Sequence, residues 1–282
     1  MDVKRLTGTF GARITGVDLT QSLEPSSVDA IREAMGAHGV LFFPGQRVMT
    51  SEEQIALAAS FGEVETPPWL TKYSTHPQVL VVEFDHPKGS GVDVWHTDAT
   101  YMEKPPAGVF IQAHILPEAG GDTCFASMEA AYDALSAPMR AMLDGLSAQH
   151  SRAELFAATK DRDQYDAAAT DVAPPVSHPL VTVNPATGRK RLFFCNLYAK
   201  RIEGLSQAES DYLLAFLTDH VKNPEFQLRV QWQVGDLAFW DNHACQHFAV
   251  PDYKGQRRMQ RVTLLGYRPR GVTERPGAGL AA

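Results

Sequence analysis

The stretch VDVWHTDATYM at residues 92–102 places His96 two positions before Asp98 in a short run of β-forming residues. Residues two apart in an extended strand point to the same face, so we expect the imidazole and the carboxylate to project side by side. Together they could share one metal ion. A surface strand that carries two polar side chains would have the same pattern, so the pair needs support from elsewhere in the chain.

A third ligand is expected from a distant strand that returns to the same pocket. The segment GDLAFWDNHACQHFAVPDY at residues 235–253 fits best, because a glycine turn and an apolar strand lead to His243 and His247. Either histidine would complete a 2-His-1-carboxylate set, which suits non-haem Fe(II) and leaves coordination positions open. Most of the remaining histidines fall in expected loops or helix ends, where a surface histidine is the simpler interpretation.

Two arginines follow in the segment QRRMQRVTLLGY at residues 256–267. By the two-residue period of a strand, Arg257 and Arg261 share one face with Met259. Two guanidinium groups on one face of an apolar strand indicate that this face meets an anion. The competing interpretation is an edge strand whose arginines reach water.

Composition sets broad limits on the kind of protein. The chain has 282 residues, of which 44% are hydrophobic and 21% charged, and its formal net charge is -7. Such a balance does not favour a nucleic-acid or anionic-membrane partner. The three cysteines fit no metal-binding spacing and are interpreted as reduced thiols of a cytoplasmic protein. The first residues lack the apolar region of a signal peptide, and no stretch approaches the roughly 18 apolar residues of a membrane span.

Short predicted strands dominate both ends of the chain, and helices lie between them. Two apolar sheets must close on each other, which predicts a mainly β fold with flanking helices (α+β). Its core would be a jelly roll, the cupin-like double-stranded β-helix. Strands are expected in 5–20, 40–43, 79–84, 92–102, 107–116, 180–183, 191–194, 226–233, 237–240 and 257–267. Helices are expected in 26–37, 51–62, 127–135 and 136–145 and after the capping box at 206–209, the last with Tyr212, Leu213, Phe216 and Leu217 on one face.

We predict one domain over residues 1–282, since no linker or internal repeat is visible. Residues 151–177 differ in composition, being polar and alanine-rich with little apolar periodicity. They are interpreted as a mobile lid over the site or as a disordered surface insertion. The tail at 271–282 is expected to be loose.

An ordered set of motifs identifies a resemblance that covers nearly the whole chain. WHTD at 95–98, GGDT at 120–123, WDNHACQH at 240–247 and RRMQR at 257–261 resemble the taurine dioxygenase family of Fe(II)- and 2-oxoglutarate-dependent oxygenases. FFPGQ at 42–46 and FGEV at 61–64 are also similar to family sequence. Any one motif could arise by chance, whereas the order and spacing of the set are specific.

The resemblance implies roles for individual residues. His96, Asp98 and His247 become the metal ligands, and the family spacing selects His247 over His243. Thr123 and Arg257 would hold the distal carboxylate of 2-oxoglutarate, with Arg258 as the neighbour that could replace Arg257. Arg261 would face the primary substrate. With Fe(II), 2-oxoglutarate and O2, such a site oxidises a substrate C–H bond, most often by hydroxylation, and releases succinate and CO2.

The substrate is less well defined by the resemblance. Pro67 stands where the namesake enzyme of the family has a histidine that binds the sulfonate, and Val92 stands where it has an asparagine. Both changes make the pocket less polar, as do Trp69 and Leu70. We therefore expect a small, partly apolar, anionic molecule other than taurine, and we leave open hydroxylation, group release or desaturation.

Two other functions are compatible with the ligand set alone. A zinc-dependent hydrolase could use two histidines and an aspartate, and a non-catalytic jelly-roll protein could keep them for structure. Neither explains Thr123 and the two arginines.

A homo-oligomer is also expected.

Overall fold

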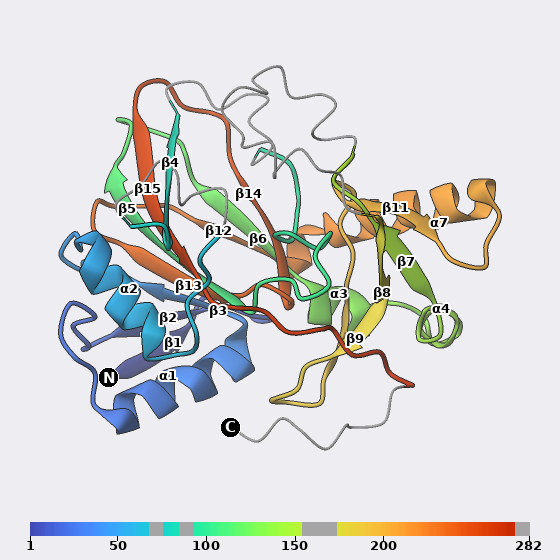
Figure 1. The fold of residues 1–282 in the computed structure, drawn as a ribbon, viewed down its shortest axis with the longest axis horizontal. Helices are drawn as coiled ribbons and strands as arrows, with labels where there is room; N and C mark the ends of the chain where they lie inside the picture. Colours follow the sequence, from blue (N-terminus) through green and yellow to red (C-terminus); the bar gives the residue numbers. More distant parts are fainter. Residues whose placement is uncertain (68–75, 85–92, 154–173, 274–282) are drawn as a thin grey trace.

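The largest sheet of the protein carries one wall of the site. In the computed structural model, which describes residues 1–67, 76–84, 93–153 and 174–273, this sheet has the strand order β1-β2-β3-β13-β5-β15-β4 (Figure 1). Its strands pair antiparallel except β2 and β3, which are parallel. They are β1 Asp2–Arg5, β2 Ala12–Thr15, β3 Val40–Phe43, β4 Val79–Phe84, β5 Gly108–Ile115, β13 Leu237–Asp241 and β15 Arg257–Thr263.

A second sheet of three strands carries the opposite wall. Its order is β12-β6-β14, with β6 Thr123–Ser127, β12 Gln227–Val230 and β14 Cys245–Ala249. Side chains of both sheets form one buried cluster, including Val40, Phe42, Val109, Phe125, Val230 and Trp240. The two sheets close on each other as the predicted jelly roll, so the fold prediction is confirmed.

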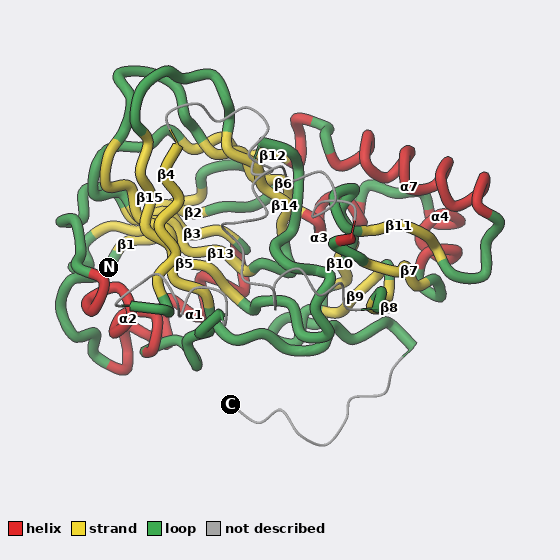
Figure 2. The backbone as a smooth tube through the Cα atoms, turned by 45° about the horizontal axis from the view of Figure 1, so that its top comes forward, coloured by secondary structure: helices red, strands yellow, loops and turns green. Residues whose placement is uncertain are grey.

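Strand β3 shows why a continuous apolar run is expected to be buried on both sides. Val40 and Phe42 belong to the cluster between the sheets, whereas Leu41 and Phe43 belong to a second cluster. That second cluster lies under α1 Pro25–His38 and α2 Ser51–Ala59, which lie together beside the larger sheet (Figures 1 and 2). Helix α1 ends at Gly39, which has the left-handed φ of 70°, and α2 begins with a capping box between Thr50 and Glu53.

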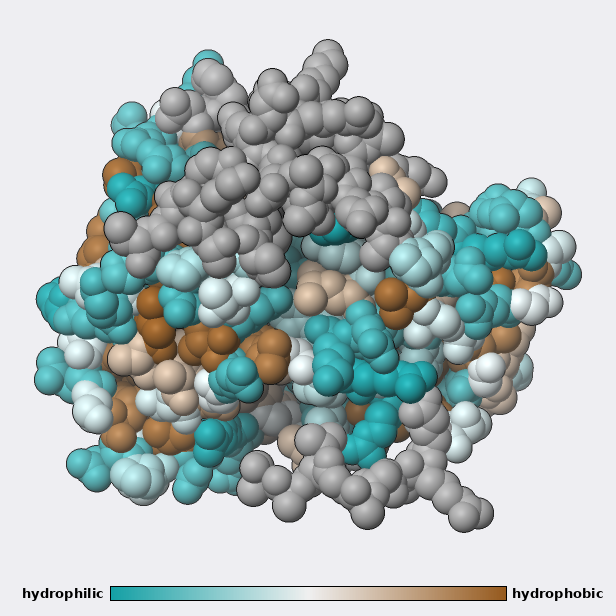
Figure 3. Space-filling view, viewed as in Figure 1, coloured by the Kyte–Doolittle hydropathy of each residue, from teal (hydrophilic) through white to brown (hydrophobic). Residues whose placement is uncertain are grey.

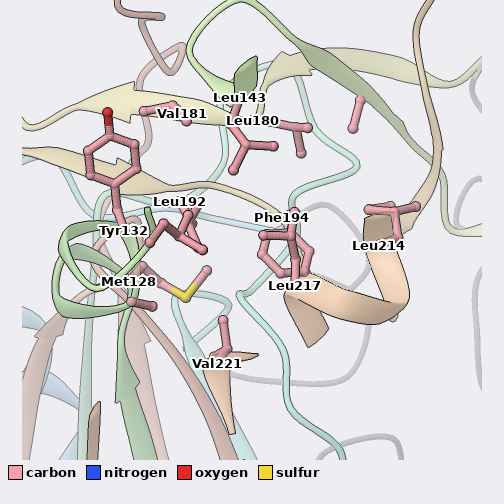
Figure 4. Packing of buried hydrophobic residues seen from close by; sticks show 14 of the residues in the cluster. Met128, Tyr132, Leu143, Leu180, Val181, Leu192, Phe194, Leu214, Leu217 and Val221 are labelled. Carbon is pink, nitrogen blue, oxygen red and sulfur yellow. The ribbon is translucent and has the colours of Figure 1, made fainter. Parts of the chain in front are cut away.

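A third cluster fills the other end of the molecule, on the right of Figure 1. It includes Met128, Leu143, Leu180, Leu192, Phe194 and Leu217 (Figure 4). The helices around it are α3 Met128–Asp133, α4 Ala137–Leu143 and α7 Gln207–Val221, with the 3-10 turn η2 Pro224–Phe226. The strands are β7 Ser147–His150, β8 Val176–Pro179, β9 Val181–Val183, β10 Lys190–Leu192 and β11 Ala199–Ile202, in the orders β11-β7-β8 and β10-β9.

The predicted strand at 92–102 is wrong. Within its described part, His96 makes only an isolated antiparallel bridge with His247, and the chain then turns through Asp98 and Thr100. Ala99 has a φ of 49°, a left-handed conformation that a strand cannot contain. A run of β-forming residues does not reveal such a turn.

The predicted apolar face of the helix after residue 206 is right for Leu213 and Leu217, which pack against the third cluster, and wrong for the two aromatic residues. In α7 the buried residues are Ser210, Leu214, Leu217 and Val221, whereas Tyr212 is 81% exposed. Phe216 is exposed as well. The buried residues follow the 3.6-residue period of one helix face. The bulky side chains of Tyr212 and Phe216 lie on the neighbouring stripe, which faces solvent.

The segment interpreted as a lid lies largely outside the described residues, as does most of the tail at 271–282. Val176 and Ser177 belong to β8, so the irregular segment ends before residue 177. None of the helices in the described ranges is long and apolar enough to cross a lipid bilayer. In the face shown in Figure 3, hydrophobic residues gather mainly on the half that carries α1 and α2.

Candidate active site

Backbone pairing brings the two predicted histidines together. The His96 N–H donates to the His247 carbonyl at 3.0 Å, and the His247 N–H donates to the His96 carbonyl at 2.8 Å. Asp98 then turns back between the rings. Its carboxylate oxygens lie 3.6 Å from Nε2 of His96 and 3.6 Å from Nε2 of His247. All three side chains are buried, and one ligand atom of each lies within 4.8 Å of the others.

The chemistry of these atoms fits a cation. Nδ1 of His96 lies 2.7 Å from the Val94 carbonyl, which can only accept, so in the neutral ring Nδ1 carries the proton and the lone pair is on Nε2, the nitrogen nearest Asp98. Burial, followed by the neighbouring His96, lowers the pKa of His247 to about 3. Burial opposes ionisation of Asp98, yet Arg261 and then the histidines lower its pKa to about 2. Two ring nitrogens and a carboxylate therefore converge in one buried place, as metal ligands do. Among the residues that the structure describes, this is the one such group.

Asn242 holds the backbone of Asp98 in place. Its side-chain oxygen accepts from the Asp98 N–H at 3.0 Å, and its Nδ2 donates to the Asp98 carbonyl at 3.1 Å. Nδ2 also donates to the Pro106 carbonyl at 3.1 Å, and the residue is fully buried. One amide thus holds the peptide groups on both sides of Asp98, at the start of the turn.

His243, the alternative third ligand, lies elsewhere. Its Nε2 donates to the Pro105 carbonyl at 3.0 Å, and its ring stacks on Tyr267 with a centroid distance of 4.4 Å. Burial, followed by the positive charge of Arg191, lowers its pKa to about 4. The structure places His247 with His96 and Asp98, and gives His243 a neutral, packed environment.

Thr123 lies on the same sheet face as His247. In the pairing of β6 with β14, His247 is opposite Phe125 and Ala249 is opposite Thr123. Since opposite residues and residues two apart share a face, Thr123 is a diagonal neighbour of His247. The predicted anion-binding threonine is therefore beside the metal-ligand group.

Arg257 reaches Thr123 from the larger sheet. Its Nε donates to the Gly121 carbonyl at 2.9 Å, and its Nη2 lies 3.5 Å from the Thr123 hydroxyl. The side chain is buried, and burial lowers the pKa of the guanidinium. No carboxylate contacts it within the described part of the chain, so a bidentate anion would supply the counter-charge. Arg258 turns the other way, to the exposed Glu83 at 3.8 Å.

Arg261 contacts a metal-ligand candidate directly. Its Nη2 lies 3.0 Å from Oδ2 of Asp98, and its Nη1 donates to Oδ1 at 3.2 Å. Glu65 lies nearby: burial raises the pKa of Glu65, while Arg261 acts in the opposite direction. Arg257 and Arg261 were predicted to share one strand face. Their guanidinium groups both point into the site, one to Thr123 and the other to Asp98.

Aromatic side chains lie close to this charged group. The rings of Tyr101 and Tyr198 meet edge to face with a centroid distance of 5.0 Å, and the Arg152 guanidinium lies 5.1 Å from the Tyr101 centroid. Burial raises the pKa of both tyrosines, and the charge of Asp98 acts on both. Of the predicted substrate residues, Pro67 is half-buried, and Trp69, Leu70 and Val92 lie outside the described residues.

Several residues at the site were not predicted from the sequence. Asn242 belongs to the WDNHACQH motif and Tyr101 to the 92–102 stretch, so the sequence could have indicated both residues. Glu65 and Tyr198 carried no comparable signal, because only the fold brings them to Arg261 and Tyr101.

Fold and site together define a jelly roll whose His-Asp-His group could hold a metal ion, with a buried arginine close to it. The chain belongs to the taurine catabolism dioxygenase TauD, TfdA family, whose model matches residues 2–263. This is a family of α-ketoglutarate-dependent dioxygenases, which confirms the predicted enzyme class.

Three relatives show the range of the family. An α-ketoglutarate-dependent sulfate ester dioxygenase from Pseudomonas putida is 36% identical, with 96% of this chain and 92% of that protein covered. An alkylsulfatase from Acinetobacter baylyi is 35% identical, with 94% and 85% covered. An α-ketoglutarate-dependent 2,4-dichlorophenoxyacetate dioxygenase from Cupriavidus pinatubonensis is 33% identical, with 91% and 94% covered.

Two solved structures share the fold. A taurine dioxygenase from Burkholderia xenovorans superposes with a TM-score of 0.83 at 35% identity, covering 97% of this chain and 92% of that one. AAD-2 in complex with Mn(II) and N-oxalylglycine superposes with a TM-score of 0.79 at 29% identity, covering 95% and 98%.

Proposed function

We propose that this protein is an Fe(II)- and 2-oxoglutarate-dependent dioxygenase that hydroxylates a C–H bond of a small, partly apolar anion, with alkyl sulfate esters as the first substrate class. The observation that supports it most is the convergence of His96, Asp98 and His247 next to the Arg257–Thr123 pair. The first group suits a metal with open positions, and the second suits a carboxylate. A zinc hydrolase would need only the first.

Each group of residues has a separate task in this proposal. His96, Asp98 and His247 would hold Fe(II), and Arg257 with Thr123 would bind the distal carboxylate of 2-oxoglutarate. Bound metal, 2-oxoglutarate and O2 supply the oxidising power, and the cosubstrate leaves as succinate and CO2. Arg261 would bind the anionic end of the substrate once a cation neutralises Asp98. Tyr101 and Tyr198 would form an apolar wall for the rest of the molecule.

The choice of sulfate esters rests on this charge pattern and on the relatives. Two of the three relatives act on sulfate esters or alkyl sulfates by name, and Arg261 offers a guanidinium that matches an anion with several oxygens. Hydroxylation of the carbon that bears the sulfate oxygen gives an unstable adduct. Its C–O bond to sulfate breaks as the hydroxyl proton leaves, which yields an aldehyde and free sulfate.

The experiment is a substrate panel with the Fe(II)-loaded protein: a medium-chain alkyl sulfate, the matching alkyl sulfonate, an aryloxyacetate and taurine. We expect succinate with every productive substrate, and aldehyde plus sulfate in equal amounts from the alkyl sulfate. A hydrolase would instead give the alcohol without O2 or 2-oxoglutarate. Turnover of the aryloxyacetate alone would keep the dioxygenase and reject the substrate class.

A further inference from the structure

We propose that Trp232 is a positioning residue that fixes the Thr123 hydroxyl as a hydrogen-bond donor toward the carboxylate of 2-oxoglutarate. The inference rests on the proposed function, because it assumes that Thr123 and Arg257 bind this cosubstrate. It adds a residue that touches neither the metal-ligand group nor Arg257 in the contacts described above.

The argument starts from which atoms can donate. The indole Nε1 of Trp232 lies 3.0 Å from the Thr123 hydroxyl oxygen. An indole N–H can only donate, so the hydroxyl accepts this bond. Its other contact is Nη2 of Arg257 at 3.5 Å, and a guanidinium nitrogen also only donates. Neither neighbour can take the hydroxyl proton.

The Thr123 proton must therefore point to a third partner. Thr123 is buried, and within the described part of the chain both hydrogen bonds of its hydroxyl are accepted ones. A carboxylate next to Arg257 would accept this proton as well as the guanidinium protons. Without the indole, the hydroxyl could rotate and turn a lone pair toward the anion, which would repel it.

The fold holds the indole rigidly enough for this task. Val230, the last residue of β12, is opposite Thr123 of β6, and Trp232 follows two residues after the strand ends. The ring packs edge to face against Phe42 of β3, with a centroid distance of 5.7 Å. Trp232 is thus fixed by the larger sheet while its N–H points into the smaller one, which preorganises the hydroxyl before the anion arrives.

The test is a double-mutant cycle of Trp232→Phe and Thr123→Val, read out as the Kd of N-oxalylglycine for the Mn(II)-loaded protein by calorimetry. Each single variant should weaken binding by roughly 5-fold, the value of one lost hydrogen bond. The double variant should bind no more weakly than Thr123→Val, because the indole acts only through the hydroxyl. Thr123→Ser should restore binding, and Mn(II) affinity should stay unchanged throughout.

The outcomes separate the inference from the function beneath it. If Thr123→Val binds N-oxalylglycine as tightly as the parent, the proposed cosubstrate site is wrong. If Thr123→Val weakens binding but Trp232→Phe does not, Trp232 has no positioning role and the function stands. The same conclusion holds if Trp232→Phe weakens binding equally in the parent and in Thr123→Val. A second measurement needs no Trp232 variant. One of the four indole N–H resonances should shift in Thr123→Val, and the absence of any shift would overturn the hydrogen bond.

Discussion

The guanidinium of Arg261 lies 3.0 Å from the carboxylate of Asp98, so the residue expected to bind substrate contacts a residue expected to bind metal. Arg261 lowers the pKa of Asp98 and keeps the carboxylate ionised. A divalent cation on Asp98 would weaken this pairing, because both positive charges compete for one carboxylate. Metal binding would then free the guanidinium for a second anion, so the metal would have to bind before the substrate.

The first prediction follows from this order. Arg261→Gln should raise the KM of the primary substrate by roughly 30-fold, since losing a charge-assisted pair with a buried anion costs about 2 kcal/mol or more. The cosubstrate KM should not change. Metal affinity should hold or increase, because a competing cation is removed. Steady-state kinetics and metal titration measure the three quantities.

The matched control is Arg258→Gln, one strand position after Arg257. Arg258 pairs only with the exposed Glu83 at 3.8 Å in the described part of the chain, and an exposed pair contributes little. All three quantities should stay at the parent values. A loss of thermal stability alone in Arg261→Gln would make Arg261 a structural partner of Asp98 and remove the main support for an anionic substrate.

The second prediction concerns the metal-ligand group. His96→Ala, Asp98→Ala and His247→Ala should each abolish metal-dependent turnover and weaken Mn(II) binding while the fold is retained. His243→Ala should keep Mn(II) binding and instead lose stability, by about 1–3 kcal/mol for a buried hydrogen-bonding group. Metal titration with thermal unfolding distinguishes the two classes. Loss of Mn(II) binding in His243→Ala with retention in His247→Ala would reverse the assignment.

Much of this site was predictable because its chemistry is encoded by short spacings. His96 and Asp98 are two residues apart, although a turn and not the predicted strand brings their side chains together, and Arg257 and Arg261 are four residues apart on one strand. The choice between His243 and His247 was different, since the residues alone left both open. Only the family spacing selected His247, and the structure then showed His243 turned toward Pro105.

The remaining features depend on contacts between distant parts of the chain. Asn242 and Asp98 are separated by 144 residues, and Trp232 and Thr123 by 109. Periodicity carries no information about such pairs. The turn at Ala99 escaped prediction for a local reason, because a left-handed alanine has no sequence signature comparable to that of glycine. The predicted single domain and homo-oligomer remain predictions.

The third prediction tests the clamp on Asp98. Asn242→Ala leaves a buried N–H and two buried carbonyls without partners, each worth about 1–3 kcal/mol. We expect a large loss of stability together with weaker Mn(II) binding, since the turn that carries Asp98 is released. Asn242→Asp keeps the acceptor for the Asp98 N–H but loses both donated bonds. Stability loss in both variants with unchanged Mn(II) affinity would show that the clamp does not position the ligand.

The fourth prediction is a loss of stability in acid. Burial, followed by His178, lowers the pKa of His150 to about 3, and burial, followed by Arg191, lowers that of His243 to about 4. The ordinary pKa of histidine is 6.5. Below that pH, both imidazoles bind a proton in the unfolded chain but stay neutral in the folded protein. Stability is therefore fully present above pH 6.5 and falls as the pH drops toward 4, by about 1.4 kcal/mol per pH unit for each histidine.

Denaturant unfolding between pH 6.5 and 4 measures this slope. His243→Gln should reduce the slope by the contribution of one proton, about 1.4 kcal/mol per pH unit, whatever the variant does to stability at neutral pH. An unchanged slope in His243→Gln would mean that this imidazole is protonated in the folded protein.

The fifth prediction uses two glycines with the same backbone conformation. Gly121 and Gly188 have φ of 74° and 72°, so alanine at either position is strained by about 1–2 kcal/mol. A Cβ at Gly121 would lie 3.0 Å from Cδ of Arg257, whereas a Cβ at Gly188 would meet nothing within 4 Å. Both alanine variants should therefore lose similar stability. Only Gly121→Ala should displace the guanidinium and weaken N-oxalylglycine binding to the Mn(II)-loaded protein. Equal binding by the two variants would show that the position of Arg257 does not control the affinity for the anion.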